Sequence, residues 1–313
     1  MRASFGLSAL LLILLLTVGA CSSSPDQPEG VFTVRNQAAR NMEFGNRYFE
    51  RAEYDQAVRF FQLALRQNAS VDHQEGVVRA HNSLGKVYGA QGDVEAAERS
   101  FLRAYSIASE IDYTGGQLQS NSNLGELYLT LGRREDAEAR LRAAEAMLPR
   151  GATTPEAAIV YHNLGSVASR RGDYASAESY IRRALEINSS EGQVAEKASN
   201  HYMLASLYSR QERFPEAVQA AELALELDKS VENSRGIAAD LTALGQIHSR
   251  AGDLETGISY YERALSVEAA LGRHRQAAAI LNALATSSRS LGRESLALQY
   301  EAERDRVLAG GRP

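Results

Sequence analysis

The 313-residue sequence has little cysteine and no tryptophan: Cys21 is its one cysteine. One cysteine cannot form an intramolecular disulfide. The six histidines have no HExxH or other metal-binding spacing. GxSxG, P-loop and dinucleotide-binding motifs are absent as well. We therefore predict no metal, no cofactor and no enzymatic activity.

A strong charge of either sign is also missing. The sequence has 34 Lys and Arg against 39 Asp and Glu, a formal net charge of −5. Proteins that bind nucleic acid usually present a basic field to the phosphates, so we predict no nucleic-acid partner. Hydrophobic residues make up 44% of the chain, an ordinary fraction that is sufficient to bury a core.

The longest apolar run lies at the N-terminus, where Leu7–Val18 follows Arg2 and precedes Gly19 and Ala20. This run is shorter than the roughly 20 apolar residues that a membrane-spanning helix needs. A charged start, a short apolar middle and small residues at the end are typical of a signal peptide. We predict that residues 1–20 are a signal peptide.

The segment Val18-Gly19-Ala20-Cys21 resembles the bacterial lipobox. The resemblance implies that Cys21 receives a diacylglyceride and becomes the first residue of the mature chain. Ser22, rather than Asp, then implies sorting to the outer membrane, facing the periplasm. The alternative is an ordinary secreted protein with a cysteine near its cleavage point, but a lone cysteine in an exported chain has no disulfide partner. Residues 21–30 are polar with two prolines, and we predict a lipidated, flexible tether.

Small residues recur every forty positions after the tether. The first series is Gly45, Gly85, Gly125, Gly165, Ala205, Gly245 and Ala285, and twelve residues after each comes Ala57, Ala97, Ala137, Ala177, Ala217, Gly257 and Ala297. A fixed period of this length indicates stacked structural repeats. Apolar residues recur at helical spacing, and no alternating strand pattern is present. We therefore predict an all-α solenoid of seven repeats over residues 31–313.

One repeat illustrates the expected unit. Leu84, Gly85 and Tyr88 lie on one helical face, and Gly92-Asp93 supplies a helix stop followed by an N-cap for the next helix. Glycine within a helix costs about 0.5–1 kcal/mol relative to alanine. We expect close approach of the paired helix, opposite the small residue twelve positions later, to offset that cost.

The stretches Leu84-Gly85-x-x-Tyr88, Leu124-Gly125-x-x-Tyr128 and Leu204-Ala205-x-x-Tyr208 resemble the tetratricopeptide repeat (TPR) family. The resemblance implies a TPR α-solenoid, a right-handed superhelix of about seven helix-turn-helix repeats with a concave groove that takes a peptide. A period of forty rather than thirty-four is similar to the long-helix subgroup that includes kinesin light chains. We expect the extra residues to lengthen both helices around loops such as Asn188–Gly192 and Asp228–Gly236, and the charged run Glu301–Arg306 to make the last repeat a polar cap.

The face of each first helix opposite its packing residues corresponds to the TPR groove. The predicted partner-binding residues are Asn82, Lys86, Asn123, Asn163, Arg170, Tyr202, Arg210, Gln246, Arg250 and Asn282. Arg170, Arg210 and Arg250 form a ladder that could bind the carboxylates of an acidic partner, or could simply stabilise helix C-termini. The asparagines could bind a peptide backbone, or could be solvent-facing polar residues.

These features predict an outer-membrane-anchored periplasmic adaptor or scaffold that binds a protein or peptide in cell-envelope assembly or maintenance. One alternative is a pilotin-like lipoprotein of type IV pilus biogenesis, although pilotins use shorter repeats. A second is a structural, homo-oligomeric envelope protein. The groove does not reproduce the Lys/Asn carboxylate clamp of chaperone-binding TPR proteins, which disfavours a chaperone-tail function.

Overall fold

The computed structural model describes residues 29–310, and the predicted signal peptide, Cys21 and residues 22–28 of the predicted tether lie outside this range. The first helix, α1, begins at Glu29 and so includes the last two residues of the predicted tether. None of the helices between residues 29 and 310 combines the length and the apolar character that a membrane crossing requires.

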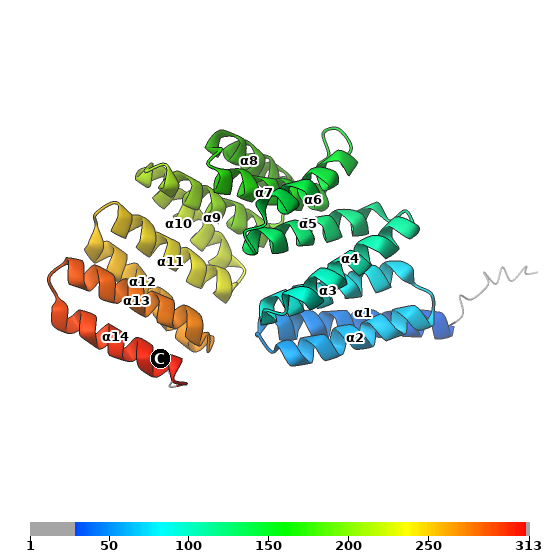
Figure 1. The fold of residues 1–313 in the computed structure, drawn as a ribbon, viewed down its shortest axis with the longest axis horizontal. Coiled ribbons are helices and arrows are strands. Elements are labelled where there is room, and N and C mark those ends of the chain that lie inside the picture. The colour runs from blue at the N-terminus through cyan, green and yellow to red at the C-terminus, as the bar shows by residue number, and fades with distance from the viewer. Residues whose placement is uncertain (1–28, 311–313) are drawn as a thin grey trace, which may run out of the picture.

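The described residues form fourteen helices and no strands, which confirms the all-α prediction (Figure 1). The helices are α1 (Glu29–Glu50), α2 (Tyr54–Ser70), α3 (Gln74–Gln91), α4 (Val94–Glu110), α5 (Thr114–Thr130), α6 (Arg134–Met147), α7 (Pro155–Arg171), α8 (Tyr174–Ser190), α9 (Val194–Arg210), α10 (Phe214–Ser230), α11 (Ser234–Arg250), α12 (Leu254–Ala270), α13 (His274–Ser290) and α14 (Glu294–Leu308). Each successive pair is one repeat, and its odd-numbered member is called the first helix below.

Most helices have 17 residues and are joined by turns of two or three residues, which accounts for the forty-residue period. The extra residues therefore lengthen both helices, as expected. The predicted loops are shorter than expected, because Asn188 and Asp228 lie in the last turns of α8 and α10, and Gly236 lies in the first turn of α11.

The turns follow the chemistry of their sequences. Gly92 has a φ of 84°, the left-handed conformation that glycine adopts without strain, and it ends α3. Asp93 follows as the N-cap of α4, where its carboxylate accepts a hydrogen bond from the backbone N–H of Ala96. Asp173 and Asp253 cap α8 and α12 in the same way, so the predicted stop-and-start signal is confirmed.

The glycines at forty-residue intervals lie where helices pair closely, as predicted. A Cβ atom on Gly85 would stand 2.4 Å from Cε1 of Phe101, and one on Gly125 would stand 2.6 Å from Cγ of Leu141. The nearest atoms therefore belong to the bulky side chain sixteen residues later. The small residue twelve residues later is also close in some repeats, since a Cβ on Gly165 would stand 3.3 Å from the Ala177 carbonyl oxygen. A large side chain of the second helix fills the space that the missing Cβ leaves on the first helix.

The first helices line the inner side of the solenoid. Consecutive first helices from α1 to α11 pack against one another, whereas no two second helices between residues 29 and 310 pack together to that extent. The stack therefore curves into an arch whose ends are α1–α2 and α13–α14 (Figure 1). One contact crosses the arch: Nη2 of Arg235, at the start of α11, donates a hydrogen bond at 2.8 Å to the carbonyl oxygen of Phe49 near the end of α1.

Candidate functional site

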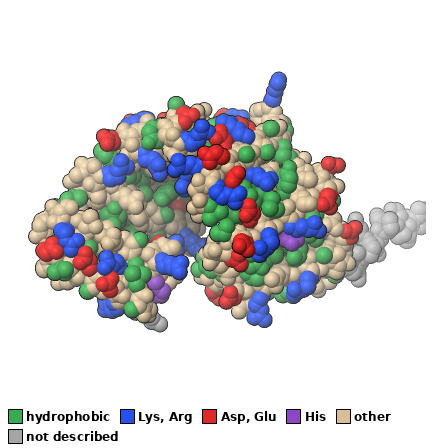
Figure 2. All heavy atoms as spheres, viewed as in Figure 1, with side chains coloured by type: hydrophobic (Ala, Val, Ile, Leu, Met, Phe, Trp, Pro, Cys, Tyr) green, Lys and Arg blue, Asp and Glu red, His purple; other side chains and the backbone are tan. Residues whose placement is uncertain are grey.

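Two adjoining cavities open on the inner side of the arch, and together they are called the groove cavities below. The first, about 440 Å³, is lined by residues of α1, α3, α4 and α5. The second, about 230 Å³, is lined by residues of α3, α5, α7, α8 and α9. They share Lys86, Asn123 and Glu126, so they form one surface that spans five repeats. Figure 2 shows a hollow between the two arms of the arch, with Lys and Arg side chains along its upper side.

Some of the predicted groove residues instead hold the repeats together. Asn82 is only 1% exposed. Its Nδ2 donates to Oγ of Ser120 at 3.1 Å, and its Oδ1 accepts from Nδ2 of Asn123 at 3.0 Å. The prediction that Asn82 binds a partner is therefore wrong. Neighbouring first helices approach closely on the inside of the curve, so this position lies between them. The Asn82 amide forms its hydrogen bonds with the next repeat instead of with a partner.

Asn123 and Asn163 hydrogen-bond a neighbouring repeat and also border a groove cavity. Both are buried, and Nδ2 of Asn163 donates to the carbonyl oxygen of Ser122 at 3.4 Å. Both also line the second groove cavity. Lys86 is exposed and borders both cavities. The structure thus brings these three predicted residues together at one place.

Four other predicted residues lie away from the groove cavities or have a partner within the chain. Tyr202 and Gln246 are exposed on α9 and α11. Asn282 is exposed on α13, and its Oδ1 accepts a hydrogen bond from Nη1 of Arg304 at 3.2 Å. Nη1 of Arg250 donates to Oγ of Ser209 at 2.7 Å, so this member of the predicted ladder is held within the solenoid.

Arg170 and Arg210 differ from Arg250. Both are exposed at the ends of α7 and α9, and within residues 29–310 neither side chain has a hydrogen bond or an ion pair. Their guanidinium groups are therefore free for an acidic partner. They also lie in the last turn of a helix, where the helix dipole stabilises a cation.

Asn200 of α9, which borders the second groove cavity, was not predicted from the sequence. Asn200 is completely buried, and its Oδ1 lies 2.8 Å from Nδ1 of His162. Burial lowers the pKa of His162, so its ring is neutral and Nδ1 donates this hydrogen bond. Nδ2 of Asn200 has no partner and the residue lines the second groove cavity. A buried, unpaired amide donor is costly unless a ligand or water completes it.

Two further residues of the second cavity were also missed. Ile159 of α7 is 44% exposed there, and Glu196 of α9 is exposed nearby. Ile159 lies three residues before His162, a position on the same helical face. That spacing was available in the sequence, so extending the predicted face by one turn would have found this residue.

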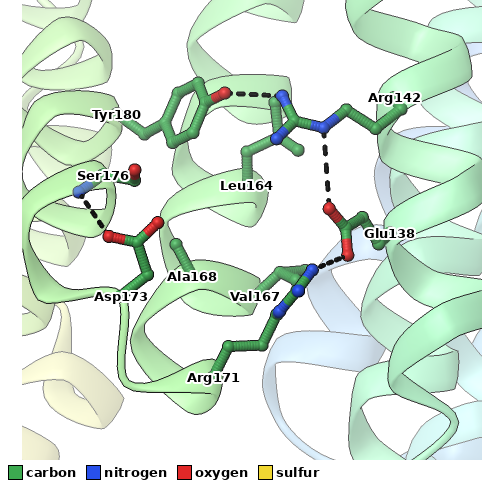
Figure 3. A pocket seen from close by; sticks show the side chains of 9 residues that line it. All are labelled: Glu138, Arg142, Leu164, Val167, Ala168, Arg171, Asp173, Ser176 and Tyr180. Atoms are coloured by element: carbon green, nitrogen blue, oxygen red, sulfur yellow. Dashed lines mark hydrogen bonds and ion pairs between the residues drawn. The ribbon is translucent and has the colours of Figure 1, made fainter.

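A separate cavity of about 380 Å³ lies between the third and fourth repeats (Figure 3). Its charged groups are already paired, since Glu138 bonds both Arg142 and Arg171, and Nη1 of Arg142 donates to the Tyr180 hydroxyl at 2.6 Å. Comparable Tyr–Glu–Arg sets join other repeats, as in Glu98 with Tyr128 and Arg133. We therefore assign this cavity to the packing of repeats.

The described residues contain no group of His, Cys, Asp and Glu side chains arranged to hold a metal ion. The groove cavities instead supply hydrogen-bonding amides, an apolar contact at Ile159 and charges of both signs at Lys86, Glu126 and Glu196. Such a surface suits recognition of a polypeptide by its backbone and side chains.

Comparison with known proteins identifies the repeats. A model described as tetratricopeptide repeat matches residues 37–110, 77–150 and 156–230, and a second model with the same description matches residues 241–271. A comparison with curated proteins gave no match.

Several solved structures share the fold at low sequence identity. The Rap conjugation gene regulator of plasmid pLS20, in complex with the Phr* peptide, superimposes with a TM-score of 0.68 at 16% identity, covering 95% of this chain and 80% of that one. A Rap protein complexed with Competence and Sporulation Factor gives 0.63 at 15%, covering 88% and 77%. A kinesin light chain TPR-like repeat structure from Podosopora anserina gives 0.52 at 17%, covering 62% and 96%. These similarities show the fold, and the family models, which match more than half of the sequence, establish that the chain belongs to the tetratricopeptide repeat family.

Proposed function

We propose that this protein is an outer-membrane-anchored periplasmic scaffold that captures a protein or peptide partner in its concave groove. The observation that carries the proposal is the pair of groove cavities, which share Lys86, Asn123 and Glu126 and are bordered by the exposed Ile159 and Glu196. Two structures of the same fold contain a bound peptide or factor, which supports a polypeptide as the class of partner.

The groove residues indicate how a peptide would be held. The exposed ammonium group of Lys86 offers a hydrogen bond to a peptide carbonyl, and Ile159 offers contact to an aliphatic side chain. Arg170 and Arg210 extend a free positive surface toward the later repeats, where acidic residues of the partner would bind. A lipid on Cys21 would hold this surface at the membrane and raise the effective concentration of the partner there.

We expect the double variant Arg170→Gln/Arg210→Gln to bind the partner roughly thirtyfold more weakly, because each of the two charge-assisted hydrogen bonds contributes about 1 kcal/mol. The measurement is recovery of the crosslinked partner from the native envelope, with circular dichroism to verify the fold. The matched control, Arg103→Gln/Arg134→Gln, removes the same charge from exposed positions of the second helices α4 and α6. Equal recovery from both variants would leave helix stabilisation as the role of Arg170 and Arg210.

Lipidation of Cys21 has a direct test in cells. Because lipid attachment requires the thiol, we expect palmitate labelling of the wild type and no labelling of Cys21→Ala. Because the variant lacks the acyl chains that would anchor the protein, it should also leave the membrane fraction. Ser22→Ala serves as the control and should label normally. Equal labelling of wild type and Cys21→Ala would refute the anchor.

A further inference from the structure

The first repeat has an unpartnered face that every later repeat covers. In the stack, each first helix packs against the second helix of the preceding repeat. For example, the Tyr128 hydroxyl donates to Oε1 of Glu98 at 2.6 Å, and the Tyr208 hydroxyl donates to Oε1 of Glu178 at 2.8 Å. Tyr48 occupies the same register in α1, but no described repeat precedes it. The side of α1 and α2 that continues the stack is therefore bare.

This bare side is aromatic and is called the end face below; it consists of Phe44, Arg47, Tyr48, Phe60 and Leu63. The Phe60 ring lies 5.3 Å from the Phe44 ring and 5.2 Å from the Tyr48 ring, which it stacks on, while the Arg47 guanidinium lies 4.6 Å above Phe44. Phe44 and Leu63 are each 39% exposed.

In later repeats the position equivalent to Phe44 is buried by packing. Leu84, Leu124 and Leu164 stand in the register of Phe44, and all three are buried. An aromatic ring left in the open at a position that is otherwise packed is an interaction surface rather than an isolated apolar residue.

The opposite end of the solenoid has a different character. The register that holds a bulky side chain in most repeats holds Glu301 in α14, and Arg289 pairs with both Glu294 and Glu301 there. Leu298 is exposed on α14, but the structure records no aromatic pair on this helix. The two ends are therefore not equivalent, and the aromatic one is nearer in sequence to Cys21.

The chain length between Cys21 and α1 limits where the end face can lie. Cys21 precedes Glu29 by eight residues, which span at most about 29 Å when extended. Phe44 lies fifteen residues into α1, roughly 22 Å along its axis. A lipid on Cys21 would thus keep the first repeat close to the bilayer surface.

The charge of the first repeat matches an anionic surface. Residues 29–70, which form this repeat, contain six Arg and five acidic side chains, a net charge of +1 in a chain whose net charge is −5. Basic residues bind anionic headgroups, and aromatic side chains prefer the interface between headgroups and acyl chains. A second copy of the chain fits less well, since a two-fold contact would place Arg47 of one end face opposite the same positive patch.

We propose that the end face docks in the headgroup region of the membrane that carries the lipid anchor, with Phe44 and Phe60 at the acyl boundary and Arg47 on anionic phosphates. This inference rests on the lipidation of Cys21 in the proposed function. It adds an orientation to the anchor: the first repeat lies on the membrane, and the later repeats extend away from it.

The absence of native tryptophan makes a site-specific test possible. The full-length, lipidated protein would carry one tryptophan, as Phe44→Trp on the end face or as the control Leu298→Trp at the opposite end. Each is reconstituted into vesicles of phosphatidylethanolamine and phosphatidylglycerol that contain brominated lipid. We expect roughly twofold quenching and a blue shift for Phe44→Trp, because docking buries the side chain at the acyl boundary, and no change for Leu298→Trp. Leu63→Trp is a second reporter on the same face if Phe44→Trp does not fold.

Three results would overturn the proposal. The first is equal quenching of the Phe44→Trp and Leu298→Trp proteins in floating vesicles, which would remove the docking and leave the anchor intact. The second is a concentration-dependent blue shift of Phe44→Trp without lipid, which would show that a second copy covers the end face. The third is protein that neither takes up palmitate nor floats with vesicles, which would remove the anchor and the docking together.

Discussion

Gly85→Ala should destabilise the solenoid by about 2 kcal/mol, even though alanine is the better helix former by roughly 1 kcal/mol. The added Cβ would stand 2.4 Å from the buried Phe101 ring, so the ring or the helix pair must shift. Urea unfolding followed by circular dichroism measures the change. Gly89→Ala, on the same helix, is the control: its Cβ would meet only the Ala97 Cβ at 3.9 Å, and we expect it to stabilise by about 0.5 kcal/mol.

The fifth repeat suggests how the clash could be relieved. It has Ala205 where five of the other six repeats have glycine, and Ala221 where the same five have a bulky residue, and both alanines are fully buried. Phe101→Ala alone should cost about 3 kcal/mol through the cavity that it leaves. In the double variant Gly85→Ala/Phe101→Ala the clash is gone, so we expect its cost to fall short of the sum by about 2 kcal/mol. Additive costs would show that the glycine is not there to accommodate the ring.

Between pH 4 and pH 8 the protein should lose about 5 kcal/mol of unfolding free energy through one carboxyl group, Asp240. Asp240 of α11 is 1% exposed and hydrogen-bonds Asp228 of α10, which is 4% exposed. Burial, followed by the charge of Asp228, raises the pKa of Asp240 to about 8. Nδ2 of Asn233 donates to Oδ1 of Asp228 at 2.9 Å, which leaves Asp240 as the member of the pair that keeps the proton.

The direction of the effect follows from the raised pKa. The unfolded chain releases this proton near pH 4, whereas the folded protein retains it to about pH 8. The stability that the shared proton contributes is therefore complete below pH 4 and is lost as the pH rises toward 8. Asp240→Asn keeps a hydrogen-bond donor without a titrating group, so it should flatten this decline and be more stable than the wild type at pH 8.

Urea unfolding midpoints measured at several pH values test this prediction. Asp112→Asn, at an exposed turn residue between α4 and α5, is the control and should retain the decline of the wild type. A decline of equal size in the Asp240→Asn variant would show that the buried carboxyl pair does not govern the pH dependence.

The repeat architecture was predictable because its causes are local. A small residue at each forty-residue interval, Gly-Asp at three helix junctions and apolar residues at helical spacing all act within one repeat, and each has the predicted place in the structure. The partner of each glycine was less predictable. Whether Ala97 or Phe101 faces Gly85 depends on how far two helices slide along each other, which small and large residues in one sequence do not determine by themselves.

The groove residues were predictable only where their surroundings stay open. Lys86, Arg170 and Arg210 are exposed as expected, because long charged side chains stay in solvent wherever the helix leaves room. Asn82 and Asn200 could not be assigned from the sequence, since an asparagine on the inner face satisfies its amide equally well with a neighbouring repeat or with a ligand.

The sequence by itself determined the helices, their caps, the forty-residue unit and membership of a repeat family, because each depends on residues that are close along the chain. Only the tertiary structure decided which inner side chains are shared between repeats, that Asn200 is buried with an unpaired amide donor, and that no residue between 29 and 310 covers the aromatic side of the first repeat. These depend on the curvature of the stack, which is the sum of small rotations between neighbouring repeats. That sum sets the distance between side chains forty residues apart. A change of about 1 Å in this distance decides whether a hydrogen bond forms between them.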